Sequence, residues 1–372
     1  MKLFVPAVIF LLAVLLLIST HADPYADKKL IEYGWDVPST QFVHDHIAEM
    51  EKAPFDGVVM KVMPDVGDED NMHALGWRVF SKQKITLDEY EHAIADLKAT
   101  KFTTFTDNFI QVIAFPGNVD WFDPGWSAIA YNAARLAEVA KLGGCKGIMF
   151  DPEHYNQRRE YHIWNYKRFS PDKKAAHSFR NYALQVKERG KEFMRAINAE
   201  YPDITILTLY GPSLPYLQAG KIEDLEKADY GLLAAFYDGM CEAATSGATI
   251  VDGYESSYGF KTRKLFQDGR KLLLESSRRI STDPKAFTDH IRAGFGIYAD
   301  KGWPERGGWH SDDFSKNYWT PESLRASLAY ALESSDRYVW IYSEELRWWN
   351  FNVPAPYQDA LALSKKGPGP GH

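Results

Sequence analysis

This sequence has few cysteines, no excess of positive charge and no recognisable phosphate-binding loop. Only 2 of its 372 residues are cysteines, which excludes a disulfide-rich scaffold and a zinc cluster with cysteine ligands. The formal net charge is −7 at pH 7, and we expect no nucleic-acid partner because phosphate backbones bind to basic faces. The sequence contains no G-x-S-x-G elbow and no Walker-type loop, and we expect neither a cofactor nor a metal ion.

The remaining composition is that of a globular protein with many aromatic rings. Hydrophobic residues make up 45% of the chain, charged residues 25%, and Trp, Tyr and Phe together 14%. This balance excludes a disordered or collagen-like chain. Aromatic rings serve hydrophobic cores as well as sugar-binding platforms, so their number alone favours neither role.

The first residues are typical of an export signal. Lys2 precedes an apolar run from Leu3 to Ile18, and the segment ending at Ala22 is similar to an A-x-A cleavage site. We expect cleavage after Ala22 and a secreted or periplasmic protein without stable membrane association. An uncleaved anchor is the alternative, but the apolar run is shorter than the roughly 20 residues that span a bilayer.

The rest of the chain alternates between strand and helix patterns, with no internal repeat and no Pro/Ser-rich linker. We therefore expect one domain over 23–364 and a disordered tail over 365–372. Strands are expected over 31–36, 55–62, within 102–115 (bent or broken near 107–108), 146–153, 204–210, 248–255, 293–300 and 338–345. Helices are expected over 38–52, 86–98, 126–142, 173–200, 214–228, 231–244, 262–279 and 321–333.

Eight strands separated by helices predict an α/β fold, a single (β/α)8 TIM barrel. A doubly wound sheet is the alternative. It normally has a Gly-rich phosphate turn after its first strand, and the segment YGWDVPST is not one. In a barrel the active site forms at the carboxyl ends of the strands.

Acids and tyrosines follow nearly every expected strand. An isolated acid after a strand commonly caps a helix, but several acids converging on one face of a barrel favour a reactive site. The residues of this set that we expect to bind substrate, together with neighbouring aromatic side chains, are Tyr33, Trp35, Asp36, Asp107, Asn108, His154, Tyr155, Tyr210, Tyr254, Tyr298, Trp340, Tyr342 and Glu344.

The fourth strand gives the sharpest prediction. With the period of two of a strand, Ile148 and Phe150 face the helices, whereas Met149, Asp151 and Glu153 face the barrel axis. Cleavage of a glycosidic bond needs two carboxyls, one as acid and one as base or nucleophile. Asp151 and Glu153 fit these roles, and a buried ion-pair site is the plain structural alternative.

The sixth and eighth strands add further candidates. Asp252 has inward parity, but Glu255 lies at the strand exit, where parity can lapse, so both remain candidate catalytic carboxyls. In the eighth strand Trp340, Tyr342 and Glu344 face inward, which gives an aromatic floor beneath an acid. A role for Trp340 in the core alone is equally compatible with this pattern.

Other chemistries are less well supported. His44 and His46 lie two residues apart in an expected helix and point about 200° apart, so they cannot share a metal ion. Lys61 has inward parity and could form a Schiff base, but a lysine packed among acids is the commoner arrangement. Cys145 and Cys241 occupy positions typical of a core.

The segments GIMFDPEHY, IVDGYE and YVWIYSEELRWW resemble strand ends of TIM-barrel glycoside hydrolases of exported bacterial type. The resemblance covers most of residues 31–350 at the level of architecture. The Asp-x-Glu pair is similar to that of chitinase-like barrels, which implies Asp151 as the substrate-assisting residue and Glu153 as the acid, although the Asp-rich run before that pair is missing here. Acids on the fourth and sixth strands also resemble α-galactosidase-like barrels, which implies Asp151 as nucleophile and Asp252 as acid/base.

The function expected is hydrolysis of a poly- or oligosaccharide, and a non-catalytic glycan-binding barrel is the alternative. We expect Glu153 to be the general acid, with a pKa raised by nearby aromatic rings and by the charge of Asp151, and Asp151 to stay ionised. Loops 67–81 and 301–319 are expected to wall the cleft. The second loop contains Trp303, Trp309, Tyr318 and Trp319, a cluster that indicates either a ligand face or a self-packed loop.

Overall fold

A computed structural model describes residues 23–66, 70–156, 158, 162–302 and 308–371. Its centre is one sheet in the order β7-β6-β5-β4-β3-β2-β1-β9-β8, in which every neighbouring pair is parallel. The strands are β1 (Lys29–Glu32), β2 (Gly57–Met60), β3 (Phe109–Ile113), β4 (Gly147–Asp151), β5 (Thr205–Thr208), β6 (Thr249–Asp252), β7 (Ile291–Ala293), β8 (Phe295–Tyr298) and β9 (Tyr338–Tyr342).

Gly294 is the point at which this sheet closes. It separates β7, which pairs with β6, from β8, which pairs with β9, so β7 and β8 are two halves of one bent strand. A Cβ on Gly294 would lie 2.8 Å from Cγ1 of Val251 and 3.2 Å from the carbonyl oxygen of Tyr338, which leaves room only for glycine. With this strand joining both edges, the sheet is a closed barrel, and the predicted (β/α)8 fold class is confirmed.

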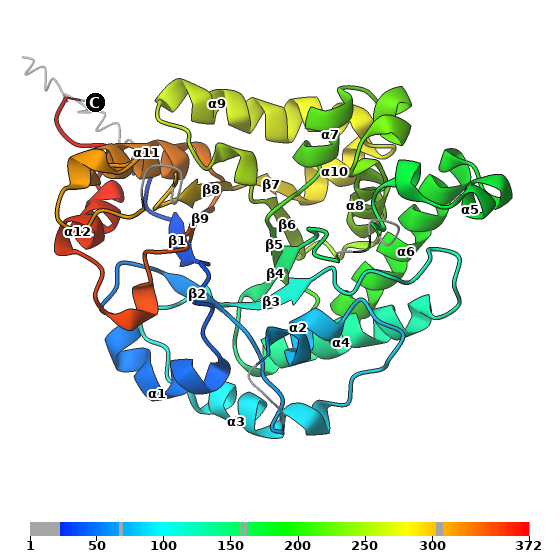
Figure 1. Ribbon diagram of the computed structural model, residues 1–372, viewed down its shortest axis with the longest axis horizontal. Helices are drawn as coiled ribbons and strands as arrows, with labels where there is room; N and C mark the ends of the chain where they lie inside the picture. The colour runs from blue at the N-terminus through cyan, green and yellow to red at the C-terminus, as the bar shows by residue number, and fades with distance from the viewer. Residues whose placement is uncertain (1–22, 67–69, 157, 159–161, 303–307, 372) are drawn as a thin grey trace, which may run out of the picture.

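Helices surround the barrel in Figure 1. The longer ones are α1 (Thr40–Met50), α3 (Glu91–Ala99), α4 (Trp126–Leu142), α6 (Phe179–Glu200), α8 (Gly231–Ala243), α9 (Arg263–Lys271), α11 (Pro321–Ser334) and α12 (Ala355–Ser364). The shorter ones are α2 (Leu75–Arg78), α5 (Pro171–Ala176), α7 (Ser213–Ala219) and α10 (Pro284–His290). The sequence did not predict α2, α10 and α12, and the helix expected over 173–200 is divided into α5 and α6.

The barrel interior is filled with side chains. Met149 and Trp340, both given inward parity by the sequence, belong to a buried cluster that also contains Val59, Phe109 and Leu207. Residues of opposite parity, such as Ile148 and Phe150, pack with the helices in a separate larger cluster. A packed interior confines ligand access to the ends of the strands.

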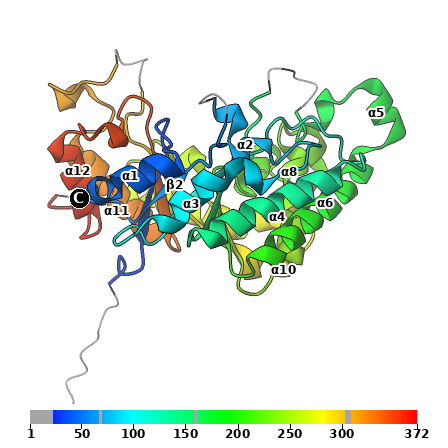
Figure 2. The same ribbon diagram turned by 90° about the horizontal axis from the view of Figure 1, so that it is seen from below.

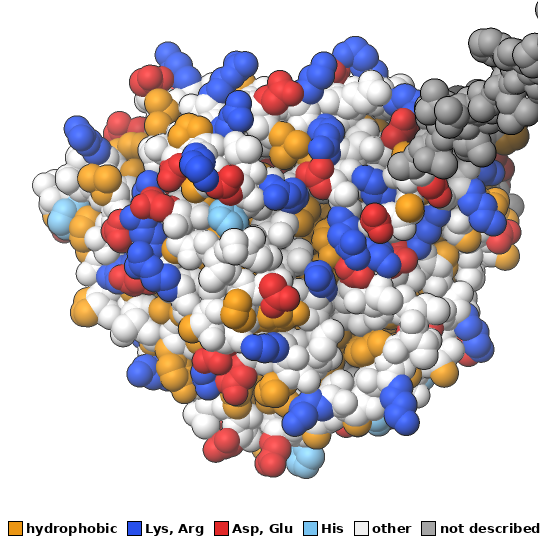
Figure 3. All heavy atoms as spheres, turned by 180° about the vertical axis from the view of Figure 1, so that it is seen from behind, with side chains coloured by type: hydrophobic (Ala, Val, Ile, Leu, Met, Phe, Trp, Pro, Cys, Tyr) orange, Lys and Arg blue, Asp and Glu red, His pale blue; other side chains and the backbone are white. Residues whose placement is uncertain are grey.

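The two ends of the barrel differ. In Figure 2 the first described residues lie on one side of the molecule, whereas α2 and α5 lie toward the other. The face drawn in Figure 3, opposite to that of Figure 1, carries lysine, arginine and carboxylate side chains interspersed. The expected signal segment, residues 1–22, lies outside the described residues, and no described helix is long and apolar enough to cross a membrane. In the tail, the carbonyl oxygen of Gly367 accepts a hydrogen bond from Arg325.

Candidate active site

A cavity of about 760 Å³ lies at the carboxyl ends of the strands. Ligand-binding pockets typically measure about 300–1,000 Å³. The residues predicted from the sequence that line it are Tyr33, Trp35, Asp151, Glu153, Tyr155, Glu255, Tyr298, Tyr342 and Glu344. They come from the ends of β1, β4, β6, β8 and β9, so the barrel brings together acids that are far apart in the chain.

Tyr155 joins the two carboxyls of β4. Its hydroxyl lies 2.8 Å from Oδ2 of Asp151 and 2.9 Å from Oε2 of Glu153. A phenol has one proton to donate, so both hydrogen bonds form only when one of the carboxyls is itself protonated and donates to the phenol oxygen. Oδ1 of Asp151 accepts a bond of 2.8 Å from the backbone N–H of Glu153. The geometry therefore favours a carboxyl pair that shares a proton.

The surroundings of Asp151 alter its pKa. Burial, together with the charge of Glu153, raises its pKa to about 7, although the hydrogen bonds from Glu153 and Tyr155 oppose the rise. The side chain is almost fully buried, at 1% exposure, and water stabilises the ionised form poorly there. With this pKa Asp151 is only partly ionised at neutral pH, whereas the sequence led us to expect that it stays ionised.

Glu255, not Asp252, is the acid of β6 that lines the cavity. Tyr254 between them adopts left-handed backbone angles, with φ 44° and ψ 63°, which end the alternation of the strand and turn Glu255 toward the cavity. Burial and the charge of Glu153 raise the pKa of Glu255 to about 8, against the effect of the nearby hydroxyls of Tyr210 and Tyr258. Its Oε2 is buried and has no hydrogen-bond partner among the described residues.

Asp252 has a structural role. It is fully buried, and its carboxylate accepts backbone hydrogen bonds from Gly211, Ser213 and Tyr254 at 3.3, 2.8 and 3.2 Å. These bonds fix the segment after β5 against the end of β6. Because Asp252 does not line the cavity, its predicted place among the catalytic carboxyls is wrong.

Trp77 and Gln111 are cavity residues that the sequence did not single out. Trp77 Nε1 donates to Gln111 Oε1 at 3.2 Å, and Gln111 Nε2 donates to the Tyr33 hydroxyl at 3.0 Å. Gly76 allows helix α2 to approach β3 closely. A Cβ at this position would lie 1.9 Å from the carbonyl oxygen of Gln111, so only glycine fits here. The inward parity of Gln111 would have predicted it as a cavity residue if the strand had been expected at Phe109–Ile113.

The opposite wall of the cavity is built from β8 and β9. The Tyr342 hydroxyl donates to Glu344 at 2.9 Å, and the ring of Tyr258 stacks on that of Tyr342 with 5.4 Å between centroids. Asp300 accepts backbone hydrogen bonds from Glu344, Glu345 and Leu346, which holds the loop after β9 in place. Lys301 and Arg347 also line this wall. Neither was predicted from the sequence as a binding residue, although Lys301 begins a loop that was expected to wall the cleft.

Asp107 and Asn108 lie at the wrong end of the barrel for the predicted role. Strand β3 begins at Phe109, after these two residues, whereas the sequence placed them at a strand end. Asp107 accepts a hydrogen bond of 2.7 Å from the hydroxyl of Tyr338, the first residue of β9. Asn108 accepts one from the backbone N–H of Val58 near the start of β2. Both residues stabilise the amino-terminal end of the barrel and are far along the strands from the cavity.

Five other predicted binding residues do not line this cavity. Trp340 is fully buried beneath it and donates from Nε1 to the carbonyl oxygen of Gly253 at 2.8 Å. Tyr254 packs outward against Phe295. Asp36 lines a neighbouring cavity. His154 stacks on His162 with 4.4 Å between ring centroids, and Tyr210 lies close enough to Glu255 to influence its pKa.

The two loops expected to wall the cleft contribute one residue each in the described parts, Trp77 and Lys301. Trp319 is fully buried and donates to the carbonyl oxygen of Tyr298 at 2.8 Å, and Trp309 packs on Tyr357. Both partners lie outside residues 301–319, so these two rings pack against the rest of the protein, and neither lines the cavity. Trp303 lies outside the described residues, as do residues 67–69 of the first loop.

No family profile and no curated protein matches the chain. Among solved structures, a GH18 chitinase from Pseudoalteromonas aurantia is similar at 12% identity and TM-score 0.43, over 91% of this chain and 100% of that one. A GH5-4 broad specificity endoglucanase from an uncultured bacterium is similar at 11% identity and TM-score 0.49, over 90% and 86%. A sugar phosphate isomerase/epimerase from Parabacteroides distasonis is similar at 10% identity and TM-score 0.40, over 91% and 97%. The chemistry of this chain therefore rests on its own residues.

Proposed function

We propose that the protein is a glycoside hydrolase that cleaves a poly- or oligosaccharide in the cavity at the strand ends. The observation that carries the proposal is the convergence of Glu153 and Glu255 on this cavity from β4 and β6. Hydrolysis of a glycosidic bond needs one carboxyl that donates a proton and one that acts as base or nucleophile. A cavity with both, beside aromatic rings, supplies these groups.

Glu255 is the carboxyl best suited to hold the proton. Its pKa of about 8, raised by burial and by the charge of Glu153, keeps it protonated near neutral pH. The unpartnered Oε2 leaves an atom from which that proton can pass to the leaving oxygen of a sugar. Glu153 then serves as the base or nucleophile, and the Asp151–Tyr155 pair orients it through the phenol hydroxyl.

Exposed aromatic rings on the cavity support a sugar ligand. Trp35 is 58% exposed and Tyr155 44% exposed, and Tyr155 lies beside Trp77 with 5.8 Å between ring centroids. Large exposed rings are unfavourable in water, whereas the apolar C–H faces of a sugar can cover them. A non-catalytic glycan-binding barrel, the alternative function, would need these rings but not a carboxyl with a pKa of about 8.

The test begins with the purified protein and a panel of polysaccharides and oligosaccharides, followed by release of reducing ends. On the substrate so found, Glu153→Gln and Glu255→Gln are each expected to reduce kcat by about 10²–10⁴-fold. Glu345→Gln is the matched control, because Glu345 follows the carboxyl end of another strand of the barrel, β9, but does not line the cavity. Binding without turnover of any glycan would favour the alternative function.

An activated aryl glycoside assigns the two roles. Its leaving group needs little protonation, so Glu255→Gln should lose much less activity on it than on the natural substrate, whereas Glu153→Gln should lose activity on both. The reverse pattern would make Glu153 the acid, as the sequence predicted. Near-wild-type activity of both variants would remove these carboxyls from the chemistry.

We also propose that the protein is exported. The residues that support this, 1–22, have the charged, apolar and small-residue order of a signal peptide. Amino-terminal sequencing of the protein recovered from outside the cytoplasm should begin at Asp23. Recovery of an intact chain with Met1 would contradict cleavage.

A further inference from the structure

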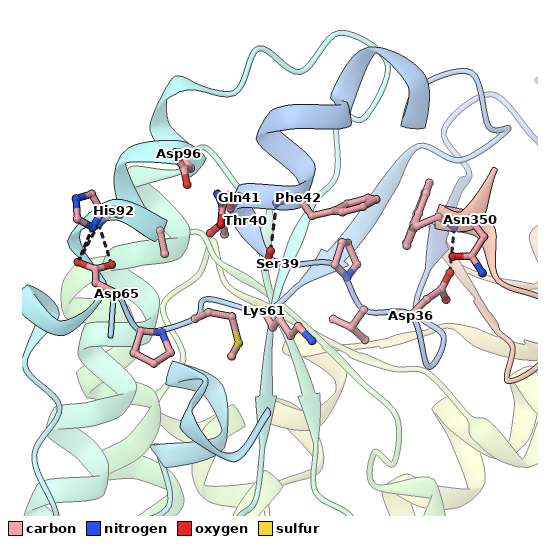
Figure 4. Close-up of a pocket in the computed structure, with 16 residues that line it drawn as sticks. Asp36, Ser39, Thr40, Gln41, Phe42, Lys61, Asp65, His92, Asp96 and Asn350 are labelled. Carbon is pink, nitrogen blue, oxygen red and sulfur yellow. Dashed lines mark hydrogen bonds and ion pairs between the residues drawn. The ribbon is translucent and has the colours of Figure 1, made fainter. Parts of the chain in front are cut away.

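A second cavity, of about 780 Å³, lies beside the first. Val37 and Lys61 line both cavities, so the two spaces meet at these residues. Figure 4 shows its side chains arriving from the segment between β1 and α1, from the end of β2 and from α3. The backbone N–H of Thr40 donates to the carbonyl oxygen of Lys61 at 3.1 Å, which holds the start of α1 against the end of β2.

Two buried polar atoms of this cavity have no protein partner. Oγ1 of Thr40 and Oδ1 of Asp36 are both buried and make no hydrogen bond to any described residue. Thr40 is only 1% exposed, yet it lines the cavity. Buried polar groups in native proteins are nearly always hydrogen-bonded. Two orphaned oxygens on one cavity therefore point to a ligand with hydrogen-bond donors.

The remaining lining residues restrict the chemistry of that ligand. Three carboxylates, Asp36, Asp65 and Asp96, line the cavity together with Lys61 and His92, so the lining carries groups of both signs and favours neither a small anion nor a small cation. Within the described residues, no group of three or more His, Cys, Asp or Glu side chains is arranged to hold a metal ion. Gln41 contributes an amide and Phe42 a ring. Such a set suits a neutral ligand that has many hydroxyls and some apolar faces.

We propose that the second cavity binds further sugar units of the same chain whose bond is cleaved in the first. The proposal rests on the proposed function and specifies its substrate as an oligosaccharide or polysaccharide long enough to pass Val37 and Lys61. Sugar hydroxyls donate to Thr40 Oγ1 and Asp36 Oδ1, and the two cavities form one continuous binding cleft.

Thr40→Val is the decisive variant. It replaces the unpartnered hydroxyl by a methyl group of similar size, so the folded protein loses no hydrogen bond and its melting temperature should stay equal or rise. A substrate that fills the second cavity would lose one hydrogen bond, which corresponds to about a tenfold loss of affinity. Ser327→Ala is the matched control, because Ser327 also has a buried, unpartnered hydroxyl but lines neither cavity.

The measurement is calorimetric binding and kcat/KM over chito-, cello- and xylo-oligosaccharides of increasing length. In the wild type both should increase with length until the second cavity is filled. In Thr40→Val the ratio of long-chain to short-chain kcat/KM should fall about tenfold, with a smaller fall in Gln41→Ala and none in Ser327→Ala.

The outcomes separate this inference from the proposed function. Turnover with no dependence on length, or an unchanged ratio in Thr40→Val, overturns the second cavity as a sugar site and leaves the glycoside hydrolase intact. Length-dependent binding that Thr40→Val weakens, without turnover, supports the cavity but contradicts the hydrolase. Absence of any oligosaccharide binding contradicts both.

Discussion

The hydroxyl group of Tyr155 lies 2.9 Å from Oε2 of Glu153. Because the same hydroxyl also reaches Asp151, the protonation of the two β4 carboxyls is coupled through one phenol. A tyrosine two residues after Glu153 thus does more than provide a ring for stacking. It sets the orientation of the carboxyl that we propose acts on the glycosidic bond.

Tyr155→Phe should raise the pKa of Asp151 above about 7, because the hydroxyl removed by this change favours the ionised form. We also expect kcat to fall by about 10–100-fold as Glu153 loses its orienting bond. Carbon-13 NMR of labelled Asp side chains across pH measures the first effect, and steady-state rates measure the second. Tyr166→Phe is the control, because its hydroxyl donates to the carbonyl oxygen of His177, away from the cavity. If the pKa of Asp151 is the same in Tyr155→Phe as in the wild type, the proposed coupling is contradicted.

Glu255→Gln should change how stability depends on pH. The pKa of Glu255 is about 8 in the folded protein and about 4.3 in an unfolded chain. Stability from the protonated carboxyl is therefore complete below pH 4 and is lost as pH rises to about 8. Glutamine cannot ionise, so the variant should gain melting temperature relative to wild type between pH 5 and pH 9, with an upper bound of roughly 4–5 kcal/mol. The same gain in Glu345→Gln would show that burial of Glu255 is not its cause.

The eight strands were predictable because each combines an apolar run with a polar end. Inward parity in β4 correctly placed Met149 and Asp151, since a regular strand of five residues alternates without interruption. Glu153 lies two residues after the strand and also lines the cavity. The same reasoning could not choose between Asp252 and Glu255. The choice depends on the left-handed backbone of Tyr254, and no residue type at that position announces such a conformation in the sequence.

The remaining errors come from strand boundaries and from tertiary contacts. Asp107 was assigned to the wrong end of the barrel because Phe102 and Phe105 precede it in the chain, whereas its strand starts only at Phe109. Trp77 was missed as an individual residue because α2 has four residues, too few for a helical pattern, and its position depends on the contact of Gly76 with β3.

Gly76→Ala tests this contact. The added methyl would meet the carbonyl oxygen of Gln111 at 1.9 Å, so α2 must move away from β3 and Trp77 with it. We expect a lower melting temperature and a higher KM, because Trp77 would leave the cavity wall. Gly125→Ala is the control: there the nearest atoms are side-chain atoms of Asp123 and Lys82, each at 3.0 Å, which can adjust. A structure or tryptophan emission spectrum unchanged by Gly76→Ala would contradict the close approach.

Asp107→Asn tests whether a residue at the amino-terminal end of the barrel contributes to stability without contributing to activity. Burial alone would raise the pKa of Asp107, but hydrogen bonds from Tyr338 and Thr106, with the charges of Arg337 and Lys29, hold it below its usual value. The ionised carboxylate thus stabilises the fold above the unfolded pKa of about 3.9, and this stabilisation is lost as pH falls through the lower folded pKa.

The asparagine variant should lose roughly 1–3 kcal/mol at pH 7, because the bonds to Tyr338 and Arg337 lose their charged acceptor. The deficit relative to wild type should shrink as pH falls below 4, where the carboxyl becomes protonated. The kcat/KM of the variant, measured at a temperature where it is folded, should equal that of wild type, because Asp107 lies at the amino-terminal ends of the strands and the cavity at their carboxyl ends. A large loss of kcat/KM in a folded Asp107→Asn variant would restore the substrate-binding role that the sequence predicted for Asp107.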